Sequence, residues 1–153
     1  MMQKPKFVYV TYIRTTPEKL WHALTDPESI RKFWAGIQVD TDWKTGSPWR
    51  LRFADGGVAD TGEILESTPP RKLVIRWLNE FRPELKAEGY SRCTMEIELV
   101  ETAVKLTVTH EMEGEGGVKF IEAVSGGWPF ILSNLKSLLE TGEIVTGHKP
   151  CKG

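Results

Sequence analysis

Alternation of apolar and polar residues predicts β-strands through the middle of the chain. It is clearest in residues 91–100 and 103–112, which lie two residues apart and therefore predict an antiparallel hairpin. Further β-branched, aromatic or alternating segments predict strands over residues 7–13, 36–43, 49–54, 58–67 and 72–78. Because most of these segments have one apolar and one polar face, we expect an antiparallel sheet with a solvated outer face.

Helical spacing replaces this alternation in two parts of the chain. Residues 15–18 read Thr-Thr-Pro-Glu, a helix-start signal, and predict a short helix over 17–24. A second start signal at residues 26–28 predicts another short helix directly after it. From residue 118 apolar residues recur at helical spacing, which predicts a long helix with Gly142 as its C-terminal stop. Two glycines and a proline predict a kink or break in it near 126–129.

The order of these elements predicts an α+β fold with one strand, two short helices, six strands and a long C-terminal helix. A curved antiparallel sheet of about seven strands around that helix is a helix-grip, and strong curvature tends to leave an apolar hollow between them. The connections at residues 79–89 and 114–117 are candidates for its mouth. We expect a single domain over residues 1–142 and a flexible tail over residues 143–153.

Composition and charge argue against several classes of function. The 153-residue chain has a net charge of −1, which argues against binding nucleic acid through a broad basic face. Its two cysteines and three histidines are too few and too scattered to suggest a disulfide framework or a metal site. No apolar run reaches the ~18 residues of a membrane span, and the N-terminus lacks the apolar stretch of a signal peptide. We therefore expect a cytoplasmic protein with no cofactor, no metal and no membrane contact.

Large aromatic residues are the main functional signal. The chain has six tryptophans, and aromatic residues occur in every element that would form the wall of the grip. They either fill the core or line a pocket for a flat or apolar small molecule. Our candidate ligand-binding residues are the inward-facing aromatic and apolar side chains with one histidine, namely Trp34, Trp49, Phe53, Trp77, His110, Met112, Phe120, Trp128, Ile131 and Leu135.

Only one of the three histidines is predicted to face inward. His110 lies on the apolar face of its strand, whereas His22 lies on an exposed helix face and His148 in the tail. His110 is either a core histidine bonded to a backbone or tyrosine partner, or a polar group that orients a ligand or transfers a proton. Cys93 also faces inward, where a thiol behaves as a small apolar group, and Cys151 lies in the tail.

The charged residues of the strands receive no role in the hollow. Asp55 and Asp60 flank a turn and are interpreted as turn residues, and Glu63 and Glu66 are expected to face solvent. Three arginines on outward strand faces form either a solvated surface or a contact for an acidic partner protein, namely Arg50, Arg52 and Arg76.

Several motifs resemble one known family. Residues 13–28, which run from Ile13 through Pro17, Trp21 and Asp26 to Glu28, resemble the opening of the activator-of-heat-shock-protein-ATPase homologue-like family. That family belongs to the START-like, or SRPBCC, superfamily of helix-grip folds. Further stretches agree with it over about residues 7–142, namely Phe33-Trp34, residues 69–73 with Trp77, and residues 127–142. The resemblance implies the helix-grip fold and, from the family name, a heat-shock ATPase as partner.

Three functions follow from these observations. The leading hypothesis is a non-enzymatic protein that binds an apolar or aromatic small molecule between the sheet and the last helix. The second is a co-chaperone-like regulator of a heat-shock ATPase, acting through outward arginines and lysines. The third is an enzyme of the cyclase or dehydratase kind, as in some superfamily relatives, which would act in the same hollow. Either a monomer or a homodimer is compatible with an exposed edge strand.

Overall fold

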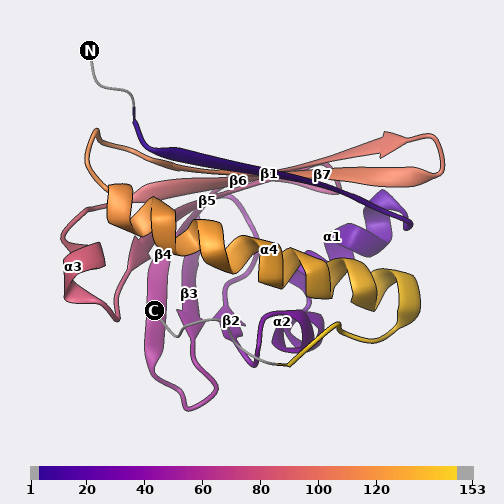
Figure 1. The fold of residues 1–153 in the computed structure, drawn as a ribbon, viewed down its shortest axis with the longest axis horizontal. Helices are drawn as coiled ribbons and strands as arrows, with labels where there is room; N and C mark the ends of the chain where they lie inside the picture. The colour runs from indigo at the N-terminus through magenta and orange to yellow at the C-terminus, as the bar shows by residue number, and fades with distance from the viewer. Residues whose placement is uncertain (1–3, 148–153) are drawn as a thin grey trace.

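Seven antiparallel strands form one curved sheet around a long C-terminal helix (Figure 1). A computed structural model of the chain describes residues 4–147, so His148 and Cys151 lie outside the described residues. The strands are β1 (Lys6–Ile13), β2 (Gln38–Asp40), β3 (Pro48–Arg52), β4 (Val58–Thr68), β5 (Lys72–Asn79), β6 (Ser91–Val100) and β7 (Ala103–Met112). Their order in the sheet is β1-β7-β6-β5-β4-β3-β2, which confirms the predicted helix-grip fold.

Four helices accompany the sheet in the described part of the chain. They are α1 (Pro17–Thr25), α2 (Pro27–Phe33), α3 (Pro83–Lys86) and α4 (Val118–Thr141). Thr16 caps α1 by accepting a hydrogen bond from the backbone N–H of Lys19, and Asp26 caps α2 in the same way through Ser29. The short helix α3 lies in a segment that the sequence had predicted to be a loop, because four residues are too few to give a helical period.

The long helix α4 runs without interruption through Pro129, so of the predicted kink or break the break is wrong. A proline removes only its own backbone N–H from the hydrogen-bond ladder. Trp128, Ile131 and Leu132 are all buried on the inner face of the helix around this position. Packing of that apolar face holds the helix together despite the missing bond.

The strand β2 is shorter than the predicted segment 36–43. The residues before it, Ala35 and Gly36, have backbone φ angles of 49° and 83°, in the left-handed region that a strand does not use. Trp43 also has a positive φ angle, of 59°. These turns on both sides leave only three residues, Gln38–Asp40, to pair with β3.

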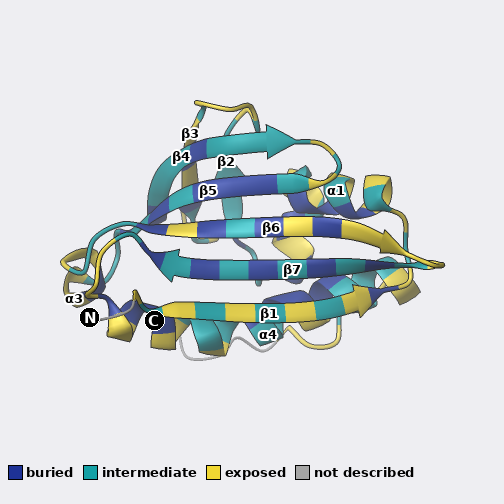
Figure 2. Cartoon of the chain, turned by 90° about the horizontal axis from the view of Figure 1, so that it is seen from above, coloured by how far each residue is buried: buried dark blue, intermediate teal, exposed yellow. Residues whose placement is uncertain are grey.

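The buried core lies between the inner face of the sheet and the helices. Figure 2 shows the outer face of the sheet, where buried and half-buried residues alternate along β7 as the sequence pattern predicts. On the inner face, α4 packs mainly along β1, β7 and the pair α1–α2. The strands β3, β4 and β5 curl away from α4, and this part of the fold contains the candidate site.

One glycine is required for the close pairing of β4 with β5. Gly62 pairs with Trp77, and a Cβ atom at residue 62 would lie 1.7 Å from the backbone oxygen of Arg76. No side chain fits in that space without moving the backbone of β5. The absence of a side chain at Gly62 therefore helps to set the position of Trp77, which lines the site.

Candidate functional site

A cavity of about 200 Å³ lies between α4 and the strands β3–β5. It is somewhat larger than an apolar cavity of roughly 150 Å³ that holds benzene, so its size suits a ligand of one or two rings. Its walls come from the α2–β2 turn, three strands, α3 with the residues before it, and α4. The lining residues are Trp34, Ala35, Ile37, Leu51, Phe53, Ala59, Asp60, Trp77, Asn79, Phe81, Leu85, Phe120, Ala123, Val124, Gly127, Trp128, Phe130 and Ile131.

Three tryptophans form a continuous aromatic wall of this cavity. The ring centroids of Trp34 and Trp128 are 5.4 Å apart, and Trp77 lies 6.0 Å from each of them. Trp49 packs behind Trp77 at 4.6 Å, outside the lining. Rings in direct contact leave no room for a ligand between them, so they offer a wall against which a flat ligand can stack.

A chain of hydrogen bonds fixes Trp128 and identifies the form of His110. Trp128 Nε1–H donates to His110 Nδ1 at 3.1 Å. An indole N–H can only donate, so Nδ1 carries no proton and His110 is neutral with its hydrogen on Nε2. That Nε2–H donates to Ser91 Oγ at 2.9 Å, and the Ser91 hydroxyl donates to the backbone oxygen of Trp77 at 3.3 Å. Burial lowers the pKa of His110 to about 3, which agrees with this neutral form.

The placement of His110 corresponds to the core-histidine alternative, with serine and tryptophan partners instead of a backbone or tyrosine partner. Both ring nitrogens have protein partners, and the side chain is fully buried and absent from the cavity lining. It therefore positions Trp128, a lining residue, through a hydrogen bond. A neutral histidine with such a low pKa has no proton to give at neutral pH.

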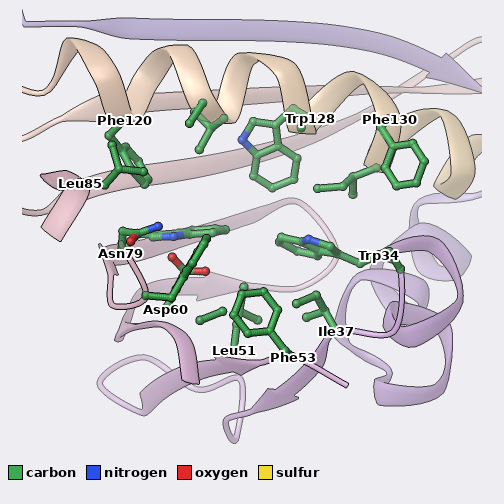
Figure 3. Close-up of a pocket in the computed structure, with 18 residues that line it drawn as sticks. Trp34, Ile37, Leu51, Phe53, Asp60, Asn79, Leu85, Phe120, Trp128 and Phe130 are labelled. Carbon is green, nitrogen blue, oxygen red and sulfur yellow. The ribbon is translucent and has the colours of Figure 1, made fainter. Parts of the chain in front are cut away.

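One end of the cavity is polar. Asp60 on β4 and Asn79 on β5 are directly paired across the two strands, so their side chains extend from the same face of the sheet. Figure 3 shows them together at this end, whereas Trp34, Ile37 and Phe130 lie at the other. Both side chains are buried, with exposed fractions of 7% and 4%. An apolar cavity with a few convergent polar groups is the usual form of a small-molecule site.

Asp60 is the titratable group of the cavity, and its interpretation as a turn residue is wrong. Its pKa is raised to about 7, mainly because the carboxyl group is buried. The negative charge of Glu80 raises it further by a smaller amount. The indole N–H of Trp77 lowers the pKa in part, yet Trp77 Nε1 makes no hydrogen bond of normal length to any described residue. At neutral pH the carboxyl group is therefore protonated in a large fraction of molecules.

The sequence contained a signal for this polar end that we did not use. The inward positions Leu73, Ile75 and Trp77 continue by the same two-residue step to Asn79, which we had assigned to a loop. Asn79 then points inward, and its cross-strand partner Asp60 does too. The nearby turn at residues 54–57 hid this pattern, because acidic residues are common in turns.

Surrounding contacts fix Asn79 and its neighbour Glu80. Asn79 Oδ1 accepts a hydrogen bond from the backbone N–H of Arg82 at 2.9 Å, and no described residue accepts from its Nδ2 group. Next to it, Glu80 pairs with Lys86 of α3 at 2.7 Å and accepts a hydrogen bond from Thr61. These contacts lower the pKa of Glu80, so it remains charged near Asp60.

The segment 79–89 contributes three residues to the lining, whereas the glycine segment 114–117 contributes none. The three are Asn79, Phe81 and Leu85. The same segment contacts the start of α4, where the Glu88 side chain accepts a hydrogen bond from the backbone N–H of Phe120 at 2.7 Å. Since Ala123 of α4 is exposed and also lines the cavity, this side of the site is close to the surface.

The structure brings six of the ten candidate ligand-binding residues into the lining, namely Trp34, Phe53, Trp77, Phe120, Trp128 and Ile131. The other four are buried outside it, namely Trp49, His110, Met112 and Leu135. Sequence reasoning missed Asp60 and Asn79, the two buried polar residues of the lining.

The chemistry available in the cavity is hydrogen bonding and proton exchange at Asp60. None of the described lining residues is a serine, threonine, cysteine, lysine or histidine, so the cavity offers no nucleophile–base pair of the usual kinds. Cys93 is buried outside the lining, and burial raises the pKa of its thiol. Within residues 4–147, no group of three or more His, Cys, Asp and Glu side chains could hold a metal ion.

The outward arginines have carboxylate partners on the protein itself. Arg50 and Arg52 both bind Asp40, at 3.0 and 2.7 Å. Arg76 binds Glu113 at 2.9 Å. They lie outside the cavity lining, and their charges are partly compensated.

No helix in the described part of the chain is long and apolar enough to cross a membrane.

Comparisons with known proteins agree with this architecture. Residues 14–140 match the family described as "Activator of Hsp90 ATPase homolog 1-like protein". Protein MLL2253 from Mesorhizobium loti has a similar structure, with a TM-score of 0.75 and 25% sequence identity over 88% of this chain and 96% of that chain. No curated protein matches the sequence.

Two further solved structures carry related names. An HSP90 activator from Plasmodium falciparum has a TM-score of 0.69 and 29% identity, covering 88% of this chain and 95% of that chain. The Aha1 dimer from Colwellia psychrerythraea has a TM-score of 0.73 and 22% identity, covering 90% and 98%. At 22% identity the last comparison shows the fold alone.

Proposed function

The chain belongs to the family of activator of Hsp90 ATPase homolog 1-like proteins, and we propose that it binds an apolar or aromatic small molecule between α4 and the sheet. The observation that supports this most is the cavity of about 200 Å³ with sixteen apolar side chains or glycines among its eighteen lining residues. Removing apolar surface from water contributes roughly 25 cal/mol per Å², and a ring stacked on this aromatic wall would bury apolar surface.

Filling the cavity from α4 tests this function. Gly127 lines the cavity, and a Cβ atom built at this position meets no atom within 4 Å. Gly127→Phe would therefore place a ring where the ligand is expected to lie. We expect the unmodified chain to bind indane, a two-ring hydrocarbon, and Gly127→Phe to lose that binding. Changes in tryptophan fluorescence and in indole N–H resonances measure both.

The neighbouring glycine supplies a matched control. Gly126 lies one position earlier on α4, is exposed, does not line the cavity and has equal room for a Cβ atom. Gly126→Phe changes the same residue type in the same helix and should bind indane as the unmodified chain does. Failure of the unmodified chain to bind indane, or equal binding by both variants, would refute binding in this cavity.

A second function rests on the family match and on the HSP90 activator among the similar structures. In this alternative the chain changes the ATP turnover of a heat-shock ATPase through its outer surface, with the cavity playing no part. The assay is the steady-state ATPase rate of purified Hsp90 with increasing amounts of this chain. A change that persists in Gly127→Phe would support the surface role, and no change at saturating concentration would exclude it.

A further inference from the structure

We propose that the polar end of the cavity recognises a neutral carbonyl oxygen, so that the ligand is a one- or two-ring compound carrying a carbonyl group. This inference rests on the proposed binding function and deepens it. Asp60 and Asn79 would both donate hydrogen bonds to that oxygen, while the rings of Trp34, Trp77 and Trp128 would contact the apolar part of the ligand.

The amide of Asn79 provides the first donor. Its oxygen already accepts a hydrogen bond from the backbone N–H of Arg82, which assigns oxygen and nitrogen within the side chain. The Nδ2 group has no acceptor among the described residues, although the side chain is only 4% exposed. This donor lines the cavity and is therefore available to an acceptor oxygen of a ligand.

The carboxyl group of Asp60 provides the second donor. It is 93% buried in a cavity without a cationic lining residue, and no described residue makes a hydrogen bond of normal length to it. The indole N–H of Trp77, which can only donate, is near enough to Asp60 to lower the pKa of its carboxyl group in part. A protonated Asp60 would therefore direct its acceptor oxygen to Trp77 and keep its O–H for the ligand. A carboxylic acid held neutral by an apolar site is a good hydrogen-bond donor.

The charges around Asp60 disfavour the other ligand classes. The charge that acts on Asp60 is that of Glu80, directly after β5, which is itself paired with Lys86 of α3, and β3 and α4 place no charged residue in the lining. An anionic ligand would be buried without a cation, which is costly. An ammonium ion would face the Asn79 donors and would need Asp60 ionised. A neutral acceptor fits the groups without such a change.

Three probes with the same ring skeleton test the inference on the full chain. They are 1-indanone, which carries a carbonyl, indane, which carries none, and 1-aminoindane, which is a cation. We expect 1-indanone to bind about tenfold more tightly than indane at pH 5.5, since two hydrogen bonds to buried donors distinguish them. At pH 8.5 this preference should decrease severalfold, because Asp60 is then ionised and cannot donate.

Variants of Asp60 separate donation from other effects. Asp60→Asn keeps the shape and supplies an amide donor at every pH, so it should retain the preference for 1-indanone and lose its pH dependence. Asp60→Leu should remove most of the preference while indane still binds. Glu63→Gln neutralises a carboxylate on the same strand outside the lining, and it should behave as the unmodified chain does.

Each outcome has a distinct meaning. Equal affinities for indane and 1-indanone at pH 5.5 would overturn the carbonyl site but leave the binding function intact. Tightest binding of 1-aminoindane would overturn it in favour of an ionised Asp60 that pairs with cations. If the unmodified chain bound none of the three probes, the proposed function itself would be refuted.

Discussion

At the scale of single residues, His110 shows how a polar side chain can serve a site without entering it. Its two ring nitrogens join Trp128 to Ser91. Within the described residues, the bond to His110 is the only hydrogen bond of the Trp128 indole. The wall of the cavity therefore depends on a histidine that lies behind the lining residues and not among them. Any proton exchange with a ligand belongs to Asp60 instead, because only Asp60 combines a position in the lining with a pKa near neutrality.

The hydroxyl of Ser91 is the acceptor on which the His110 Nε2–H depends. Ser91→Ala leaves the His110 Nε2–H buried without an acceptor, and we expect it to reduce the free energy of unfolding by about 1–3 kcal/mol. Urea denaturation at pH 7 measures the change. ¹⁵N resonances of the imidazole should also show the Nε2–H form in the unmodified chain. Ser133→Ala, at an exposed position of α4, is the control. An Nδ1–H form would contradict the assignment.

At the scale of elements, the start of α4 depends on a residue from another part of the chain. Gly117 precedes the helix and has no side chain to cap it, whereas Glu88 accepts the hydrogen bond of the Phe120 N–H. A carboxylate near a helix N-terminus also interacts favourably with the helix dipole. This contact ties the segment that carries α3 to the helix that forms the opposite wall of the cavity.

Removal of this cap should therefore affect stability. We expect Glu88→Ala to lower the free energy of unfolding by about 1 kcal/mol, because one helix N–H loses its partner. Glu88→Gln keeps an acceptor oxygen and should cost less. Glu115→Ala, an exposed residue in the turn before α4, serves as the control in thermal and urea unfolding. An equal effect of Glu88→Ala and Glu115→Ala would show that the bond contributes nothing.

The same elements show how far the sequence could predict the fold. Alternation located β6 and β7 residue for residue, because strands with one buried face leave a period of two. The start signals located α1 and α2. The four residues of α3 and the left-handed turn at Ala35 were missed, since their conformations depend on contacts distant in sequence or on single dihedral angles.

The candidate site was predictable only in part, for a physical reason. Aromatic residues of the lining were found because large apolar side chains on inward faces must meet inside a grip. Asp60 could not be recognised from its own neighbours, because its burial results from pairing with Asn79 nineteen positions later. The volume that remains between the side chains depends on the curvature of the sheet, which no local pattern encodes.

At the scale of the whole molecule, Asp60 and His110 should oppose each other in the dependence of stability on pH. Asp60 has a folded pKa of about 7 against an ordinary value of 3.8, so the folded state loses stability as the pH rises from about 4 to 7. His110 has a folded pKa of about 3 against 6.5, so the folded state loses stability as the pH falls through that range. Each effect is on the order of 4 kcal/mol, and they nearly cancel between about pH 4 and 6.5.

Removal of the Asp60 carboxyl group should reveal the pH dependence of stability that is due to His110. Asp60→Asn abolishes the pH dependence due to Asp60 and leaves the one due to His110. This variant should therefore be more stable than the unmodified chain at pH 8 and lose that advantage as the pH falls toward 4. Urea denaturation across this range measures the difference, with Asp55→Asn, at an exposed turn, as the control. Parallel curves for Asp60→Asn and the unmodified chain would mean that the buried carboxyl is ionised throughout. In that case the cavity would hold a negative charge at neutral pH, which would favour a cationic ligand over a neutral one.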